Sequence, residues 1–262
     1  MQYLIVSMAA LIVAALTLFS GFGLGTLLMP VFAIFFPIEL AVAATAVVHL
    51  ANNIFKIFLV GRRANFRIVA LFAIPASLAA MIGAYLLSYM QGIDVIYSYS
   101  LGSYALSTTP VKIVIGVLVV IFGLLELLPI LKKIELPRKM VPIGGILSGF
   151  FGGLSGHQGA LRTTFLIRLG MPKEVFVGTI VVSAVIVDIF RLAVYGITFY
   201  SMRTSILNGS DVKSLIIVGA IAAFLGSFIG SRLLKKITMS LINRIVGIML
   251  LILGLALAMG IV

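Results

Sequence analysis

Residues 149–159 read GFFGGLSGHQG and interrupt an apolar block that runs from about residue 141 to residue 169. A helix needs about 20 residues to cross ~30 Å of hydrocarbon, so this block is too long for a single crossing. Glycine clusters break transmembrane helices, because glycine lacks a packing side chain and permits unusual backbone angles. The stretch therefore predicts a hydrophobic segment that is broken within the membrane.

The first block, at about 3–36, has a similar break, since residues 20–25 read SGFGLG. Of the 262 residues, 62% are apolar and only 10% are charged, whereas soluble domains carry about 25% charged residues. This composition excludes a water-soluble protein and predicts an all-α integral membrane protein. Six further blocks have the length of single crossings, at about 40–60, 67–90, 111–131, 174–199, 213–234 and 241–262.

The net charge of +12 comes from basic residues in short loops between the apolar blocks. Such placement is typical of membrane topology and does not indicate a nucleic-acid partner. The absence of cysteine excludes disulfides and thiolate metal sites. The N-terminus lacks the basic region of a cleaved signal, so we expect the mature chain to start at Met1.

The two broken blocks each begin one copy of an internal repeat. Each copy has one broken block and three ordinary blocks, which predicts a first transmembrane repeat at 1–134 and a second at 135–262. A shift of 135 residues superposes Pro37 on Pro172, Asn53 on Asp188, Lys56 on Arg191 and Gly61 on Gly196. With other loop offsets, Gly83 falls on Gly230, Gly116 on Gly247 and Gly123 on Gly254.

Loop charge predicts that the second repeat is inverted relative to the first. If the broken blocks are re-entrant hairpins, each entering and leaving on one face, all basic clusters fall on one side, as the cytoplasmic enrichment of Lys and Arg requires. If every block crosses once, Lys235 and Lys236 fall on the opposite side from the others. The clusters are Arg62/Arg63/Arg67, Lys132/Lys133/Arg138/Lys139, Arg168/Lys173 and Arg232/Lys235/Lys236/Arg244.

Polar side chains inside the apolar blocks are the candidate functional residues, because a charge near a helix centre costs about 2.5–3.5 kcal/mol. His49, Asn52, Asn53 and Lys56 follow helical spacing and share one face. The matching helix of the second repeat carries Asp188 and Arg191, so cations recur at the equivalent positions. His49 and Asp188 are the proton-coupling candidates, since histidine titrates near neutrality.

Structural interpretations of these residues remain open. Asp188 and Arg191 are three residues apart, which also suits an ion pair that fixes helix packing. Lys56 lies close enough to the loop glycine to extend its amine to the membrane interface. His49 also suits a histidine that only packs two helices together.

Both glycine breaks would present a helix N-terminus, and therefore free backbone N–H groups, near the membrane midplane. Gly25 and Thr26 follow the first break, and the second adds side chains that favour an anion. Arg162 supplies a planar fork of donors, although with Arg168 it could also belong to the cytoplasmic rim. The candidate anion-binding residues are Gly25, Thr26, Asn53, Lys56, His157, Gln158, Gly159, Arg162, Asp188 and Arg191.

Catalytic and nucleotide-binding motifs are missing from the sequence. Neither glycine-rich break ends in Gly-Lys-Ser/Thr, and neither histidine lies in an HExxH motif. We therefore expect no enzyme, no cofactor and no metal.

The chain resembles the TauE/SafE family of sulfite exporters, also called toluene-sulfonate uptake permeases. The resemblance is carried by residues 149–159 with Arg162, by the Val187-Asp188-Ile-Phe-Arg191-Leu segment, and by the repeated glycine break with its proline-led helix. It covers essentially the whole chain and implies transport of sulfite, organosulfonates or related small anions, more often by export.

The hypothesis is a secondary transporter, an exporter in the first instance, that moves a small anion and couples to protons. An anion channel and a structural or assembly protein are the alternatives. The expected location is the cell membrane of a prokaryote, crossed several times. The expected partners are a small anionic substrate and membrane lipid, with no nucleic acid and with a homodimer left open.

Overall fold

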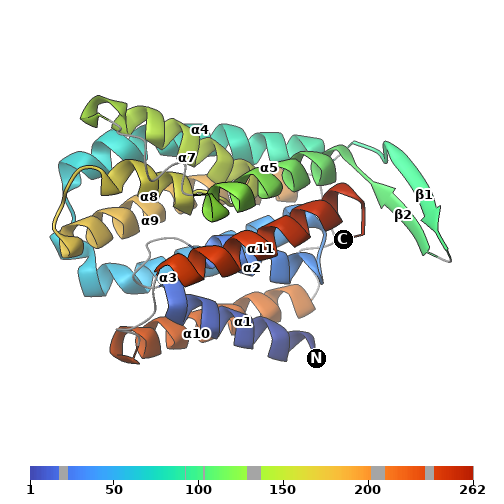
Figure 1. Cartoon of the computed structure of the whole chain (residues 1–262), viewed down its shortest axis with the longest axis horizontal. Helices are drawn as coiled ribbons and strands as arrows, with labels where there is room; N and C mark the ends of the chain where they lie inside the picture. The colour runs from blue at the N-terminus through green and yellow to red at the C-terminus, as the bar shows by residue number, and fades with distance from the viewer. Residues whose placement is uncertain are drawn as a thin grey trace.

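The computed structural model of the chain describes residues 1–17, 23–91, 93–102, 104–128, 137–201, 210–233 and 239–261. The proposed repeat boundary at 134/135 lies outside these residues, as do Ser20–Phe22 of the first break and Lys132, Lys133, Lys235 and Lys236 of the basic clusters. The described part is a bundle of helices with one projecting β-hairpin (Figure 1).

The helices agree closely with the apolar blocks of the sequence. Each of the two glycine-broken blocks forms a pair of short helices, and each ordinary block forms one long helix. The helices are α1 (Gln2–Thr17), α2 (Leu24–Ala33), α3 (Ile38–Val60), α4 (Phe66–Met90), α5 (Pro110–Leu127), α7 (Val141–Ser155), α8 (Gly159–Ile167), α9 (Lys173–Ser201), α10 (Ser210–Leu233) and α11 (Met239–Ala258), with short 3-10 turns η1 (Gly61–Arg63) and η2 (Arg138–Met140).

Five of the described helices are long and apolar enough to cross a membrane: Ile38–Phe58, Phe66–Met90, Pro110–Leu127, Lys173–Thr198 and Val212–Gly230. Helix α4 shows why they suit lipid. Its outward face carries large apolar side chains at Ile74, Leu78 and Ile82, each 60–62% exposed, whereas the middle of its buried face, from Ala73 to Ala84, consists of alanine, serine and glycine. Large apolar residues outside and small ones inside are typical of helices that pack closely within lipid. The prediction of a helical integral membrane protein is confirmed.

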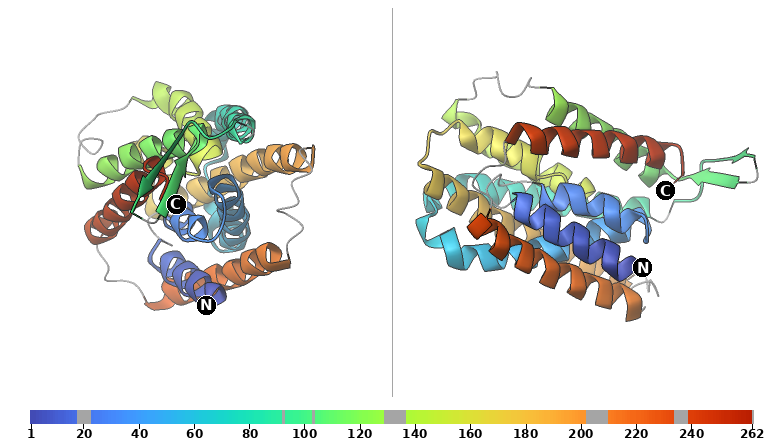
Figure 2. Two further views of the ribbon diagram at one scale, coloured as in Figure 1. Left: turned by 90° about the vertical axis from the view of Figure 1, so that its right-hand side faces the viewer. Right: turned by 60° about the horizontal axis from the view of Figure 1, so that its bottom comes forward.

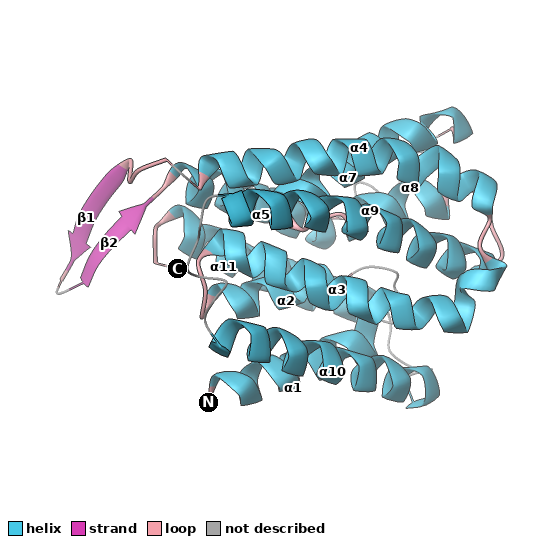
Figure 3. Cartoon of the chain, turned by 180° about the vertical axis from the view of Figure 1, so that it is seen from behind, coloured by secondary structure: helices cyan, strands magenta, loops and turns pink. Residues whose placement is uncertain are grey.

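The segment between α4 and α5, which lies between two predicted apolar blocks, contains a β-hairpin of β1 (Tyr97–Leu101) and β2 (Tyr104–Thr108). The β-hairpin extends beyond the ends of the helices (Figure 3), so the fold is not entirely α-helical as predicted. Alternating Tyr and Ser residues favour a strand, and Gly102 at φ +64° allows the tight turn. The hydroxyl of Tyr99 donates to the carbonyl of Met259 at 2.6 Å, which ties the hairpin to the end of α11.

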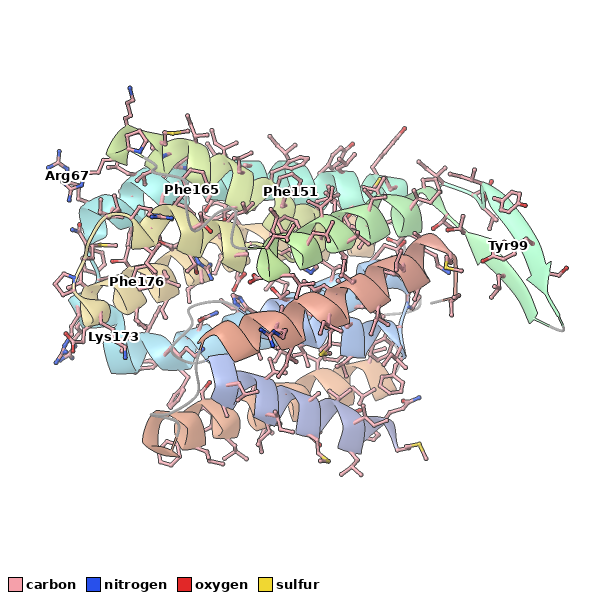
Figure 4. All side chains as sticks on the ribbon, in the orientation of Figure 1. Arg67, Tyr99, Phe151, Phe165, Lys173 and Phe176 are labelled. Atoms are coloured by element: carbon pink, nitrogen blue, oxygen red, sulfur yellow. The ribbon has the colours of Figure 1, made fainter. Side chains whose placement is uncertain are left out.

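The two ends of the bundle differ in charge. The hairpin end holds β1, β2 and both termini, and the opposite, basic end holds η1, the start of α7 and the end of α8 (Figures 1 and 2). Arg67 and Lys173 lie at the basic end and Tyr99 at the hairpin end (Figure 4). The exposed basic side chains of loops 61–67, 138–139 and 168–173 therefore collect at one end.

Each pair of short helices begins and finishes at one end of the bundle, the first pair at the hairpin end and the second pair at the basic end. Helix α1 starts at the hairpin end, and α2 finishes there, just before the start of α3. Helix α7 starts at the basic end, and α8 finishes there, just before the start of α9. Each pair is thus a helical hairpin whose tip reaches into the bundle.

Candidate binding site

The tips of the two helical hairpins meet beside α3. A Cβ atom built on Gly25, in the first turn of α2, would lie 3.4 Å from the carbonyl oxygen of Gly156 and 3.7 Å from Cδ2 of His49. Gly156 turns the chain between α7 and α8 with φ +81°, and Gly23, directly before α2, has φ +115°. Side chains other than glycine are strained in this region, so the glycine breaks are what permit these turns.

Both tips present the N-terminus of a short helix at this junction. The first bonds within these helices run from Leu27 N to Gly23 O at 2.8 Å and from Arg162 N to Gln158 O at 3.1 Å. The N–H groups of the preceding turn, including those of Gly25, Thr26 and Gly159, therefore have no acceptor within their own helix. Such groups favour anions, since the helix dipole adds positive potential at the same point.

Helix α3 carries the polar face that the sequence predicts. His49, Asn52, Asn53 and Lys56 are all buried, although each lies in an apolar segment. Asn52 contacts Ser227 of α10 at 2.7 Å, and with its amide oriented to donate there, its oxygen accepts from Nζ of Lys56 at 3.2 Å. Lys56 is 7% exposed, so its amine is held inside the bundle and does not extend to the interface.

Asp188 of α9 is the centre of the site. Its Oδ2 lies 2.6 Å from Nδ1 of His49, and its Oδ1 accepts from Nε2 of Gln158 at 2.8 Å. Oδ1 also accepts from Arg191, from Nε at 3.0 Å and from the terminal guanidinium nitrogen at 2.7 Å. The predicted ion pair of α9 therefore exists, but its carboxylate also joins α3 to the tip of the second hairpin.

His49 lies between Asp188 and Asn53. Its Nδ1 is 2.6 Å from Asp188, and the amide nitrogen of Asn53 is 3.2 Å from both Nδ1 and Nε2. Asn53 also donates to the His49 carbonyl at 2.9 Å, which holds the amide in place. The short contact with Asp188 therefore places a proton between Nδ1 and the carboxylate.

Helix α9 also holds the end of α7. The second terminal nitrogen of Arg191 donates to the Gly152 carbonyl at 2.7 Å, and the Tyr195 hydroxyl donates to the Gly153 carbonyl. Ser148 donates to the carbonyl of Gln158 at 2.8 Å and closes the turn between α7 and α8. Carbonyls at the end of a helix need such partners, because they have none within the helix.

His157 lies in the same turn and is 2% exposed. Its Nδ1 lies 2.8 Å from the Ser155 carbonyl, and its ring stacks on Phe122 of α5 at a centroid distance of 5.4 Å and an interplanar angle of 7°. Nε2 has no hydrogen-bond partner among the described residues. The turn therefore adds a buried polar atom to the junction of the two hairpins.

Arg162 is 1% exposed in the second turn of α8, whereas Arg168, six residues later, is exposed at the basic end. Only Arg168 belongs to the rim. Around the junction of the hairpins, the buried cations of Lys56, Arg162 and Arg191 accompany one carboxylate, Asp188, a local excess of two positive charges; the other buried carboxylate of the described residues, Glu39, lies in the first turn of α3. No group of three or more potential metal-binding side chains occurs in the described ranges. The arrangement suits an anion.

Sequence reasoning missed three contributors to this region. Tyr195 lies one helical turn after Arg191, so spacing alone could have found it. Phe122 and Ser148 carry no such signal, because their contacts depend on how α5 and the α7–α8 turn are packed.

Residues 6–257 match the protein family described as "Sulfite exporter TauE/SafE". Comparisons with curated proteins and with solved structures gave no significant match. The family match spans both hairpins, all the long helices and every residue of the site. The chain therefore belongs to the TauE/SafE sulfite exporter family, a family of membrane transporters and not of enzymes.

Proposed function

We propose that the chain is a secondary transporter that exports a small anion, such as sulfite, an organosulfonate or a related carboxylate. The observation that carries the proposal is the buried excess of positive charge where the hairpin tips meet. Three cations in an apolar bundle are costly, at about 2.5–3.5 kcal/mol each on insertion scales. An anionic substrate would offset that charge.

We propose that two inverted repeats build the fold. The contacts support a two-fold relation: α4 packs on α7 as α1 packs on α10, and the equivalent helices α3 and α9 pack on each other, as do the equivalent helices α5 and α11. Under this relation, the approach of Gly83 to the Phe150 carbonyl is equivalent to that of Gly230 to the Ala15 carbonyl. Gly116 likewise faces Gly254, and Gly123 faces Gly247, which are the pairs that an antiparallel exchange of repeats requires.

The helical hairpins would then be re-entrant, one from each side of the membrane, with their tips at the midplane. The basic end lies in the cytoplasm by the enrichment of Lys and Arg in cytoplasmic loops, within the cell membrane of a prokaryote. Rocking of one repeat against the other would expose the junction to each side in turn.

In this transporter the substrate binds between the hairpin tips and the polar faces of α3 and α9. The backbone of Gly25, Thr26 and Gly159 supplies N–H donors. His49 and Asp188 carry the coupling proton, since they share a hydrogen bond in the centre of the site. Charge and further hydrogen bonds come from Asn53, Lys56, His157, Gln158, Arg162 and Arg191.

Two measurements on purified protein test the proposal. Sulfite, methanesulfonate and acetate are screened for stabilisation against heat, and at least one is expected to raise the unfolding temperature. If none does, a structural or assembly protein is favoured. Planar-bilayer recording then separates the mechanisms, because a transporter gives no single-channel steps, whereas an anion channel gives them.

A further inference from the structure

The donors around Asp188 already form a complete anion-binding site. We call this set the Asp188 cradle: Nδ1 of His49, Nε2 of Gln158, and Nε and the terminal nitrogen of Arg191. The four donors lie 2.6–3.0 Å from the carboxylate oxygens and come from α3, the α7–α8 turn and α9. The side chain of Asp188 is fully buried, so water does not compete for it.

The cradle is shaped for a pair of oxygens on one central atom. One oxygen takes the three donors of Gln158 and Arg191, and the other takes the donor of His49. Carboxylates, sulfite and sulfonates all present such an edge, with one oxygen for the guanidinium and Gln158 and a second for His49. The cradle would bind the head group of the proposed substrate if Asp188 were not already there.

We propose that Asp188 is a resident ligand, and that the substrate anion replaces its carboxylate in the cradle as that carboxylate takes up one proton. The inference rests on the proposed function and adds the means of coupling. A proton from water bonds to an Asp188 oxygen, and the neutral acid no longer competes for the four charge-oriented donors. The negative charge of a monoanion then takes the place of the charge that Asp188 has lost, so the net charge of the site is unchanged.

The groups near Asp188 make its carboxylate the one that takes up the proton when the substrate anion binds. Arginine is a donor only and stays charged, and His49 directs Nδ1 at the carboxylate at 2.6 Å, so Asp188 is the anion of this cluster. Helix α4 and η1, which pack on α9, contribute only exposed titratable groups, namely Arg62, Arg63, Arg67, Tyr85 and Tyr89. The other interior titratable groups described are Glu39, His49 and Lys56 on α3, Arg162 on α8, His157 in the turn, and Arg191 and Tyr195 on α9, and Glu39 lies in the first turn of α3.

The test measures binding of methanesulfonate, which stays singly charged across the range, to the detergent-solubilised chain at several pH values. Binding that takes up one proton weakens about tenfold per pH unit wherever Asp188 is ionised. In Asp188→Asn the cradle has no charged occupant, so binding is expected to be tighter and independent of pH. Glu174→Gln is the matched control, because Glu174 is an exposed carboxylate on the same helix and should leave the pH slope unchanged.

A second measurement needs no variant and so does not depend on folding of Asp188→Asn. Methanesulfonate added to the natural chain in weakly buffered detergent should remove about one proton from solution per anion bound. Binding without proton uptake, or tighter binding to the natural chain than to Asp188→Asn at every pH, overturns the inference and leaves the proposed function standing. A pH slope that survives in Asp188→Asn but is lost in His49→Gln assigns the proton to His49 and also overturns it. No binding of methanesulfonate by either protein at any pH overturns this inference, and only if sulfite and acetate also fail to bind is the proposed function overturned with it.

Discussion

Replacement of Arg191 by glutamine should destabilise the protein unless Asp188 is neutralised as well. Arg191 is 1% exposed and donates twice to Asp188 and once to the Gly152 carbonyl. Arg191→Gln leaves a buried carboxylate with only His49 and Gln158 as partners, and breaking a buried pair in this way costs about 3–5 kcal/mol. In Asp188→Asn/Arg191→Gln no unpaired charge remains, so most of that loss, to within about 1–2 kcal/mol, should be regained.

Thermal unfolding in detergent measures the difference. The chain has no tryptophan and no cysteine, so its eight tyrosines, and not thiol-reactive dyes, provide the fluorescence. At about 2–4 °C per kcal/mol, Arg191→Gln should unfold about 6–20 °C below the natural chain, with the double variant close to it. Neither variant should transport, because the cradle has lost its guanidinium. Equal losses of stability in the single and double variants would refute the role given to the buried pair.

Three further predictions test the packing and the topology. Gly149→Ala places a methyl group against the backbone of Ala76 and should destabilise the protein by about 1–3 kcal/mol. Gly196→Ala is the control, because no atom lies near its Cβ position, and thermal unfolding should show no loss of stability. Gly25→Val should separate the hairpin tips and weaken anion binding about tenfold, or about 1.4 kcal/mol, as measured by titration. Gly25→Ala should bind the anion as the natural chain does, because its Cβ would lie at ordinary contact distance. Cysteines placed at Ser98 and Ser205 should react with a membrane-impermeant reagent from the same side, and labelling from opposite sides would contradict the inverted repeats.

Much of the fold could be predicted from the sequence because lipid constrains helices strongly. Apolar runs of fixed length can only be spanning helices, so α3, α4, α5, α9 and α10 follow from hydropathy alone. The breaks in the two long blocks could also be predicted from their glycines, since Gly23 and Gly156 adopt backbone angles that other residues avoid. The hairpin of β1 and β2 was not predicted. Its alternating Tyr-Ser pattern is short, and the polarity of the segment indicates only that it lies outside the membrane.

The site was predictable only within each helix. Helical spacing places His49, Asn53 and Lys56 on one face, and it pairs Asp188 with Arg191. It says nothing about contacts between helices, so the bond between His49 and Asp188, which are 139 residues apart, could not be foreseen. Burial was similarly hidden: Arg162 and Arg168 look alike in the sequence, but the packing of α8 buries the first and exposes the second.

Anion flux in proteoliposomes is the most direct test of the central claim, that the buried cations bind the transported anion. The natural chain, Arg162→Gln and Arg168→Gln are reconstituted at equal density, and exchange of sulfite or methanesulfonate across the membrane is followed. Both arginines lie in the same short segment, but only Arg162 is buried at the junction of the hairpins. We predict that Arg162→Gln abolishes flux and that Arg168→Gln retains it. Full flux from Arg162→Gln, or equal loss from both variants, would contradict the account.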